Sequence, residues 1–398
     1  MKVLQINKFL YNVGGSETYM FKLSEALMEL GHEVKFWGME HEKNLVVDEF
    51  NCFANNVDFK NLSNTQKISN IYRTIYSIDN VKKIKKLIKH WKPDIVHIHN
   101  YNFQLTPSIL KEFYKKNIKV VQTIHDSQMV CPYHRLYNFQ RESTCVKCVE
   151  GGFYNCIKDK CFDNSLFKST VGAIESYLYH GLDYYNKYID YYISPSQFLK
   201  NLVSKRVYQP IEVIPNFVDA LLDQKNFSNN KDSYYLYYGR VSKEKGIIDI
   251  IPIFEKLKLK LVVVGTGEQV SKIQQSENII YLGPKYEEEL FSAIANAKYV
   301  IQPSKWFENC PMTIVESFSL GVPVIGANHS GFKELIQDGK TGFILDFTNK
   351  ETLENELLRV DSMYTEDLRQ QAFGFYVDTL SKQQHLSKVV KIYESLLT

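Results

Sequence analysis

The chain has 398 residues, more than one hydrophobic core usually supports, so its length predicts two domains of roughly 200 residues each. Hydrophobic residues make up 44% and charged residues 23%, a composition typical of a globular protein and unlike that of a disordered chain. Because 48 basic residues nearly balance 45 acidic ones, giving a net charge of +3, we expect no nucleic-acid partner.

The N-terminus is a short strand-like run, Lys2 to Ile6, and no long apolar segment follows it. This pattern lacks the features of a secretion signal. No apolar stretch approaches the ~18 residues that a membrane-spanning helix requires. We therefore expect a cytoplasmic protein whose contact with a membrane is peripheral, at the inner face of the cytoplasmic membrane.

In the first half of the chain, short apolar runs alternate with segments of helical period, which predicts a parallel sheet covered by helices. The first helix is expected from Ser16 to Leu30, and Gly31 stands where a left-handed residue would end it. The expected strands are Lys2–Ile6, Glu33–Trp37, Asp94–Ile98, Lys119–Ile124 and Asp190–Ile193.

A basic amphipathic helix is predicted from Val81 to Lys92. Lysines cover most of this helix, and its apolar residues share one face: Val81, Ile84, Leu87, Ile88 and Trp91. A core helix with a solvated lysine face explains the pattern. Attraction of the lysines to an anionic membrane surface explains it as well, so the sequence leaves both interpretations open.

Cysteines gather in one segment, about residues 131–161, where the alternation of strands and helices pauses. An odd total of seven cysteines and the lack of an export signal argue against a disulfide framework. The Cys-x-x-Cys spacing predicts a structural zinc site, with one further cysteine as an alternative ligand. Reduced thiols without a metal are the competing interpretation. The predicted ligands are Cys145, Cys148, Cys156 and Cys161, with Cys131 as the alternative.

A second alternation of strands and helices follows a polar stretch, Asn226–Asp232, and predicts a second doubly wound sheet. The connection between the two halves is expected between Ser194 and Asp219, where three prolines interrupt short segments. The strands expected in this half are Tyr234–Tyr238, Lys260–Val264, Ile279–Leu282, Tyr299–Ile301, Val322–Ile325 and Phe343–Leu345.

Charged and glycine-rich turns directly follow several strands. Gly14 and Gly15 open the first helix, where backbone N–H groups can approach an anion, although a tight turn explains two glycines equally well. Arg240 and Lys245 follow the strand that ends at Tyr238, at the sheet edge where parallel sheets bind ligands. Such a pair suits a diphosphate, because arginine can clamp two oxygens and lysine adds a compact charge. A solvated charged turn is the alternative.

Two glutamates flank a predicted helix start further along the chain. Pro311 suits the first turn of a helix, so Glu308 is expected on the preceding loop and Glu316 within the helix. If the N-terminus of this helix points at a phosphate, Glu308 can meet a sugar ring and Glu316 can accept hydrogen bonds from ribose hydroxyls.

Taken in order, these motifs resemble the family-4 glycosyltransferases of the GT-B fold, over nearly the whole chain. The resemblance implies an α/β protein with two Rossmann-like doubly wound domains facing across a cleft. The N-terminal, acceptor-side domain would cover 1–205, the donor-binding domain 206–378, and a helix over 379–398 would cross back. The motifs are Gly14-Gly15, His125-Asp126, Ile214–Asp219, Arg240 with Lys245, Val264–Glu268, Glu308 with Glu316, and Gly321–Ile325.

The resemblance implies transfer of a sugar, with retention, from a UDP-, GDP- or dTDP-sugar to a glycan or polyprenyl-linked acceptor in surface polysaccharide or glycolipid synthesis. Arg240 and Lys245 would hold the diphosphate, Glu308 the transferred sugar, Glu316 the ribose and His125 a sugar hydroxyl. A packed core histidine is the alternative for His125. Further donor contacts are expected from Gly14, Gly15, Asn216, Gly239, Gly265, Asn309, Cys310, Pro311, Met312 and Thr313.

The sequence also bears on cofactors and on competing functions. It contains no Asp-x-Asp, the pair with which transferases of the other common fold hold a metal, so no catalytic metal or cofactor is expected. A nicotinamide-dependent oxidoreductase is disfavoured, because Val270 stands where its fingerprint requires a third glycine. A non-catalytic sugar-nucleotide binding protein is the other alternative, but it would not need Glu308 and His125 together.

Overall fold

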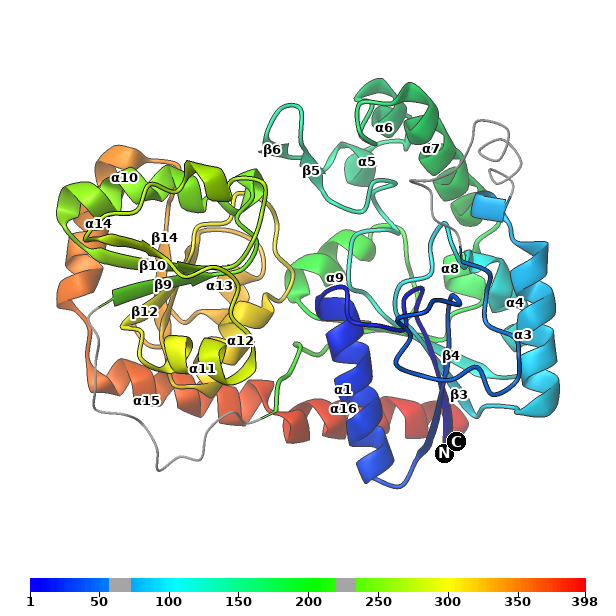
Figure 1. Cartoon of the computed structure of the whole chain (residues 1–398). Coiled ribbons are helices and arrows are strands. Elements are labelled where there is room, and N and C mark those ends of the chain that lie inside the picture. The colour runs from blue at the N-terminus through cyan, green and yellow to red at the C-terminus, as the bar shows by residue number, and fades with distance from the viewer. Residues whose placement is uncertain (57–72, 220–233) are drawn as a thin grey trace. The chain divides into compact units, whose positions relative to one another are not determined.

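The computed structural model describes residues 1–56, 73–219 and 234–398, and the chain divides into two compact units. Each unit contains a six-stranded parallel sheet covered by helices (Figure 1), which confirms the predicted α/β class. The polar stretch Asn226–Asp232 lies outside the described residues. Unit 1 comprises Met1–Gln140, Cys145–Ile214 and Leu386–Thr398, and unit 2 comprises Arg141–Thr144 and Pro215–His385.

The sheet of unit 1 contains the five expected strands and one that the sequence did not indicate. The additional strand lies in the segment predicted to connect the two halves, and it pairs with β7 at the sheet edge. Pro210 directly precedes it, and a proline is tolerated at the start of an edge strand. In sheet order the strands are β2 (Glu33–Trp37), β1 (Lys2–Ile6), β3 (Ile95–Ile98), β4 (Lys119–Thr123), β7 (Tyr191–Ser194) and β8 (Ile211–Val213).

Several helices of unit 1 begin or end at residues whose chemistry explains their bounds. Ser77, Ser165 and Ser196 cap three of them by accepting a hydrogen bond from a first-turn N–H group. Gly31, with φ of 83°, follows the first helix as expected. The helices are α1 (Gly15–Glu29), α3 (Ile78–His90), α4 (Leu110–Lys115), α5 (Lys147–Glu150), α6 (Tyr154–Lys158), α7 (Leu166–Gly181), α8 (Tyr184–Lys187) and α9 (Gln197–Val203).

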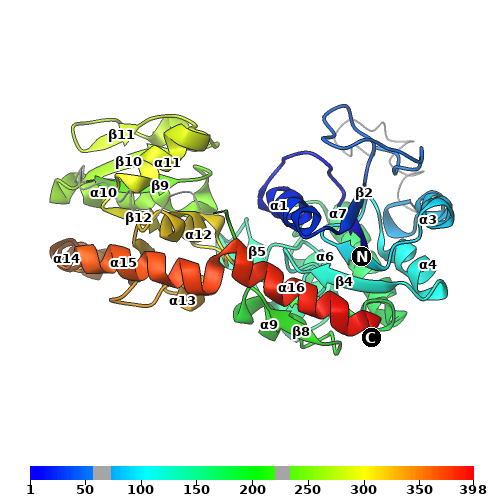
Figure 2. The same ribbon diagram turned by 90° about the horizontal axis from the view of Figure 1, so that it is seen from below.

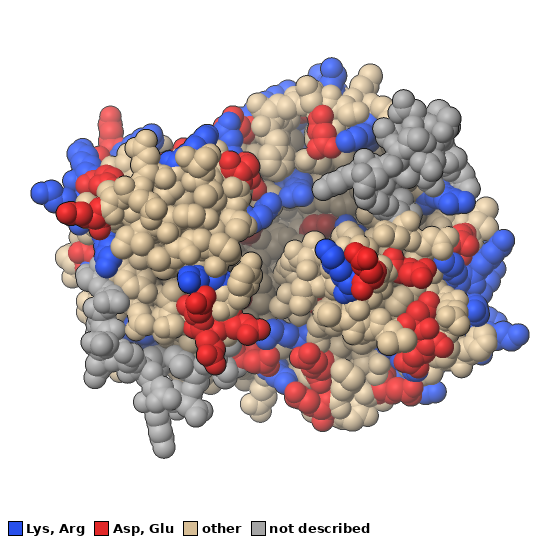
Figure 3. Space-filling view, viewed as in Figure 1, with Lys and Arg blue, Asp and Glu red and all other residues tan. Residues whose placement is uncertain are grey.

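The basic amphipathic helix is α3, and its apolar face belongs to the core. Ile84 and Leu87 are fully buried, and the other three apolar residues of that face are at most 8% exposed. Lysines of the opposite face gather at the edge of unit 1 (Figure 3). Some of them bond locally: Lys83 Nζ donates to the Phe53 carbonyl at 2.7 Å. The apolar face of α3 cannot insert into a bilayer while the helix stays packed against the core. Only its lysines are therefore available for contact with a membrane.

The sheet of unit 2 contains all six strands that the sequence predicted, with ends that differ by no more than a few residues. Helices α10 (Ile247–Leu257) and α14 (Lys350–Ser362) cover one face of it (Figure 1). In sheet order the strands are β11 (Ile279–Tyr281), β10 (Lys260–Val264), β9 (Tyr234–Tyr238), β12 (Tyr299–Gln302), β13 (Val324–Ala327) and β14 (Gly342–Leu345).

The other face of this sheet is covered by α11 (Glu287–Ala295), α12 (Met312–Ser319) and α15 (Glu366–Phe375). Helix α12 packs beside α15 (Figures 1 and 2), and Phe318 of α12 is fully buried in the core on that side. Each face therefore has its own buried apolar cluster.

The last helix, α16 (Lys382–Leu397), begins in unit 2, and from Leu386 onward its residues belong to unit 1. Within unit 1, Tyr393 contacts the first sheet, because its hydroxyl lies 2.5 Å from Nδ1 of His97 on β3. In the described parts of the chain, none of the helices combines the length and the apolar character needed to cross a bilayer.

Candidate functional site

A cavity of about 130 Å³ lies at the carboxyl ends of β9 and β12 in unit 2. Open parallel sheets bind their ligands at this edge. The cavity brings together a basic residue, an acidic residue and the start of α12. Its lining residues are Tyr237, Tyr238, Gly239, Lys245, Gln302, Glu308, Pro311, Met312 and Thr313.

The start of α12 presents unpaired polar groups at this cavity. Pro311 occupies the position before the helix and offers no side-chain acceptor to the first-turn N–H groups. The Thr313 Oγ1 atom is buried and has no hydrogen-bond partner among the described residues. Uncapped N–H groups at a helix N-terminus attract anions, so this end of the cavity suits a phosphate.

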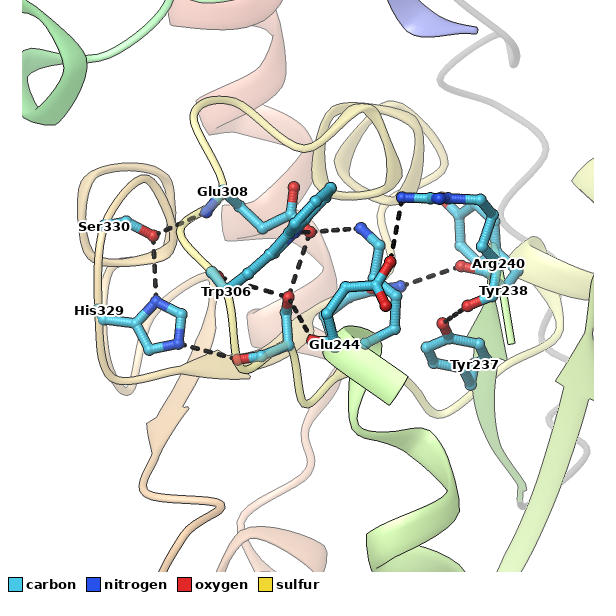
Figure 4. Close-up of polar contacts among 11 residues, drawn as sticks. Tyr237, Tyr238, Arg240, Glu244, Trp306, Glu308, His329 and Ser330 are labelled. Carbon is cyan, nitrogen blue, oxygen red and sulfur yellow. Dashed lines mark hydrogen bonds and ion pairs between the residues drawn. The ribbon is translucent and has the colours of Figure 1, made fainter. Parts of the chain in front are cut away.

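Glu308 is the centre of a hydrogen-bond cluster beside the cavity (Figure 4). Its Oε1 atom forms an ion pair with Lys245 Nζ, and it accepts hydrogen bonds from Trp306 Nε1 at 2.6 Å and from Ser304 Oγ at 3.2 Å. Its backbone N–H donates to Ser330 Oγ at 3.0 Å. These contacts fix the carboxylate in one orientation.

The same contacts keep Glu308 ionised. Burial acts to raise the pKa of Glu308, but the charge of Lys245 and the hydrogen bonds from Lys245, Trp306 and Ser304 outweigh it and lower the pKa below its ordinary value. Lys245, predicted to bind the phosphate, and Glu308, predicted to bind the sugar, therefore form one ion pair. Their side chains are 18% and 15% exposed.

Arg240 and Lys245 both lie near the indole of Trp306, within 5.5 Å and 5.1 Å of its ring centroid. Arg240 also pairs with Glu244 at 3.3 Å, and its side chain remains 56% exposed (Figure 4). The guanidinium can thus reach a ligand from one side, while the buried carboxylate of Glu244 pairs with one of its terminal nitrogens. Trp306 positions both cations and Glu308, a role that its place in the sequence did not reveal.

Glycines allow the loops of the site to pack backbone against backbone. Gly265 has φ of 137°, and a Cβ atom added there would lie 1.8 Å from the Gly239 carbonyl oxygen. At Gly331, an added Cβ would lie 1.8 Å from the Asn309 carbonyl oxygen. The Gly331 N–H also donates to the Glu308 carbonyl at 2.8 Å, so this glycine supports the loop that carries Glu308.

Two further predicted residues lie in α12 or against the loop before it. Asn216 binds the Cys310 carbonyl through its side-chain amide at 3.1 Å and holds the loop before the helix. Glu316 lies in α12, as predicted, and burial together with the charge of Glu316 raises the pKa of Tyr238, whose hydroxyl donates to the Thr313 carbonyl at 2.7 Å. Ser304, His329 and Ser330, by contrast, were not indicated by the sequence. His329 Nε2 donates to the Ser304 carbonyl at 2.8 Å, and His329 Nδ1 lies 3.1 Å from Ser330 Oγ.

His125 belongs to unit 1, where it follows β4 and is partly buried. Its Nε2 atom lies 2.9 Å from His99 Nδ1, and His99 Nε2 lies 2.8 Å from Gln5 Oε1. Tyr19 of α1 packs edge-on against the His125 ring. Burial lowers the pKa of His125 to about 4, although Asp126 acts to raise it, so the ring is neutral at neutral pH.

Gly14 and Gly15 also lie in unit 1, at the start of α1, where Gly14 provides no side-chain cap. Within residues 1–56, 73–219 and 234–398, no three His, Cys, Asp or Glu side chains are grouped so as to hold a metal ion.

Comparisons with known proteins cover both units. A family model described as Glycosyltransferase Family 4 matches residues 13–220, more than half of the chain. A second, described as Glycosyl transferases group 1, matches residues 219–374, which contain the cavity and the cluster around Glu308.

Individual relatives are distant. The lipopolysaccharide 1,2-N-acetylglucosaminetransferase of Salmonella typhimurium is 28% identical over 183 residues, 38% of this chain and 48% of that protein, so the match spans about half of the relative. The apo lipopolysaccharide outer core galactosyltransferase WaaB superposes with a TM-score of 0.66, at 17% identity and over 99% of both chains. Anabaena Alr3699/HepE, solved in complex with UDP and glucose, gives 0.65 at 14% identity, over 99% of this chain and all of that one. These likenesses show a common fold.

Proposed function

Since the chain belongs to the family-4, group 1 glycosyltransferases and has their GT-B fold, we propose that it transfers a sugar from a nucleotide-sugar donor to a glycan or lipid-linked acceptor, with retention of configuration. The observation that carries this proposal is the cavity in unit 2. It combines Lys245, the carboxylate of Glu308 and an uncapped helix N-terminus. That combination suits a ligand with a phosphate at one end and hydroxyl groups at the other.

The diphosphate of the donor would lie at the start of α12, against Lys245 and the exposed guanidinium of Arg240. Positive charge placed there stabilises the negative charge that develops on the departing diphosphate. Lys245 and Arg240 would thus supply the positive charge that a divalent metal ion supplies in metal-dependent transferases. Catalysis by these residues is therefore proposed to be metal-independent.

Glu308, fixed by Trp306 and Ser304, would accept hydrogen bonds from hydroxyls of the transferred sugar. In the proposed reaction, the acceptor oxygen bonds to the anomeric carbon on the face from which the diphosphate departs. The departing phosphate oxygen takes the proton of the acceptor hydroxyl, so no base from the protein is needed. The protein then acts by positioning and by charge stabilisation.

The complex of Alr3699/HepE with UDP and glucose supports a nucleotide-sugar donor, and the names of the Salmonella relative and of WaaB support a surface-polysaccharide or lipopolysaccharide acceptor. A non-catalytic sugar-nucleotide binding protein remains the second candidate, because the cavity alone would serve it. The fixed, ionised Glu308 favours the enzyme.

A panel of UDP-, GDP- and dTDP-sugars tests the proposal, with release of the nucleoside diphosphate as the measured product. We expect turnover of at least one donor, and a loss of about 100-fold or more in kcat/KM for Lys245→Ala and for Glu308→Ala. The matched controls are Lys256→Ala and Glu354→Ala, which break an exposed ion pair in the same unit and should keep full activity. Binding of a donor without any turnover, with or without acceptor glycans, would favour the second candidate.

A further inference from the structure

The cysteine segment of unit 1 contains little of what normally stabilises a folded segment. Its helices α5 and α6 are four and five residues long. Its buried apolar residues are few: Cys148, Phe153 and Cys156 pack against Ala173 of α7, and Leu136, Tyr137 and Val149 are buried as well. Segments with so small a core commonly require a disulfide or a metal ion. All cysteines of this segment are free thiols, so no disulfide supports it.

Five thiol-bearing side chains line one small cavity in this segment. Its volume is about 20 Å³, which is room for one ion or one water molecule and too little for an iron–sulfur cluster. The remaining two cysteines, Cys52 and Cys310, do not line it. The five are Cys131, Cys145, Cys148, Cys156 and Cys161.

Backbone N–H groups near Cys131 favour its thiolate form, although burial opposes them. Burial raises the pKa of the Cys131 thiol, and the N–H groups of Leu136, Arg135 and Tyr133 act to lower it. Several N–H donors on one sulfur stabilise the thiolate, which is the form that binds metals. Such contacts also surround the cysteine ligands of metal centres, where they tune the metal. The geometric observation on which the metal site rests is the cavity lined by five thiols.

We propose that Cys131, Cys145, Cys148 and Cys161 bind one structural zinc ion as four thiolates, and that Cys156 remains outside this set. Four thiolates in a tetrahedron suit zinc. This set differs from the one expected from spacing alone. Cys156 is the most deeply buried of the five, at 1% exposed, and packs with Phe153 and Ala173 in the apolar cluster, which leaves the other four for the metal.

In the described residues, no three of these sulfur atoms surround a common point at the distance of a metal ligand. A cysteine sulfur moves by rotation about a single side-chain torsion. Binding therefore requires the sulfurs that line the cavity wall to turn inward as their protons leave.

Elemental analysis of the full-length chain, purified without chelators or metal-affinity resin, tests the proposal. We expect one zinc per chain and no stoichiometric iron. After removal of the metal, added Co²⁺ should produce the intense visible absorption of tetrahedral cobalt and a sulfur-to-cobalt charge-transfer band. Cobalt bound without these bands, or a protein that neither contains zinc nor takes up Co²⁺, would overturn the site.

Serine substitutions then identify the ligands. Cys131→Ser, Cys145→Ser, Cys148→Ser and Cys161→Ser should each lose most of the zinc, whereas Cys156→Ser and the distant control Cys52→Ser should keep it. Loss of zinc in Cys156→Ser, with zinc retained in Cys131→Ser, contradicts the proposed set. If a variant does not fold, release of zinc from the native chain by a mercurial reagent counts the coordinating thiols instead, and a count other than four overturns the set.

Discussion

Lys245 and Glu308 are 63 positions apart in the sequence and form an ion pair beside the cavity of unit 2. In the site without a ligand, each side chain neutralises the charge of the other. A diphosphate that engages Lys245 would therefore meet an ammonium already held in place by a carboxylate. The pair therefore has two roles, since it stabilises the folded site and it supplies the charges that would bind the donor.

Lys245→Met should lower the free energy of unfolding by about 1–3 kcal/mol at pH 7, because Glu308 keeps its charge in a partly buried position without a partner cation. Urea denaturation measures this. Lys256→Met, which breaks the exposed pair with Glu354, should change it by less than about 1 kcal/mol. The deficit of Lys245→Met should shrink as the pH falls toward 4, because protonation of Glu308 removes the unpaired charge. A deficit that is independent of pH would contradict this account.

His99 and His125 should make stability depend on pH. Burial lowers the pKa of His99 well below its ordinary value, and His97 and His125 add to this, while the pKa of His125 falls to about 4. The unfolded chain then binds more protons than the folded one below pH ~6.5. The contribution is fully present above pH ~6.5 and is lost as the pH falls toward 4.

Denaturation at several pH values tests the role of His99. Between pH 6.5 and 4.5, the dependence of the unfolding free energy on pH should be shallower in His99→Gln than in the native chain, by up to about 1.4 kcal/mol per pH unit. Lys256→Met serves as the control and should retain the native slope. Equal slopes in His99→Gln and the native chain would mean that His99 is not held neutral.

If His125 contacts the sugar as a neutral imidazole, turnover should show no inflection near pH 6.5, where an ordinary histidine titrates. His125→Ala should reduce kcat by about 10-fold or more, and His125→Gln should retain more activity. Calorimetry with UDP should show unchanged affinity in both variants, since the proposed nucleotide contacts lie in unit 2. A parallel loss of UDP affinity would contradict that division of roles.

Gly265→Ala should destabilise the protein by more than about 2 kcal/mol and abolish donor turnover, because the added Cβ would meet the Gly239 carbonyl oxygen. Gly283 provides a matched control. It also has a positive φ, 70°, but nothing lies within 4 Å of an added Cβ. Its alanine variant should cost only the ~1–2 kcal/mol of a left-handed residue and keep its activity. Thermal unfolding and the donor assay distinguish the two.

The lysines of α3 should attract the protein to anionic vesicles through charge alone, because the apolar face of this helix is buried. Flotation should decrease as salt is raised, and Lys82→Glu with Lys89→Glu, both exposed, should weaken it further. Binding to neutral vesicles at high salt would contradict this and would require that α3 leave its core.

Much of the fold could be predicted because buried parallel strands are continuous apolar runs between turn residues, as Lys260–Val264 shows. The strand Ile211–Val213 was not predicted, because three residues are too few to show a hydrophobic periodicity. The start of α12 could be placed from Pro311. The contact of Glu308 with Ser330 could not be predicted, because it depends on how separate loops after β12 and β13 pack through Gly331. Its contacts with Trp306 and Ser304 could not either, because they depend on the irregular path of a single loop. Likewise, cysteine spacing suggested a metal, but the deep burial of Cys156 in an apolar cluster could not be predicted from that spacing.

The course of α16 has a consequence for how the protein is made. Unit 1 is encoded mostly by the first half of the chain, yet Leu386–Thr398 belong to it as well. These residues leave the ribosome after all of unit 2. The contact of His97 with Tyr393 can therefore form only once unit 2 has been made. Unit 1 begins to fold first but is completed only after unit 2 has been synthesised, and a nascent chain released before Tyr393 would leave the first sheet without that contact.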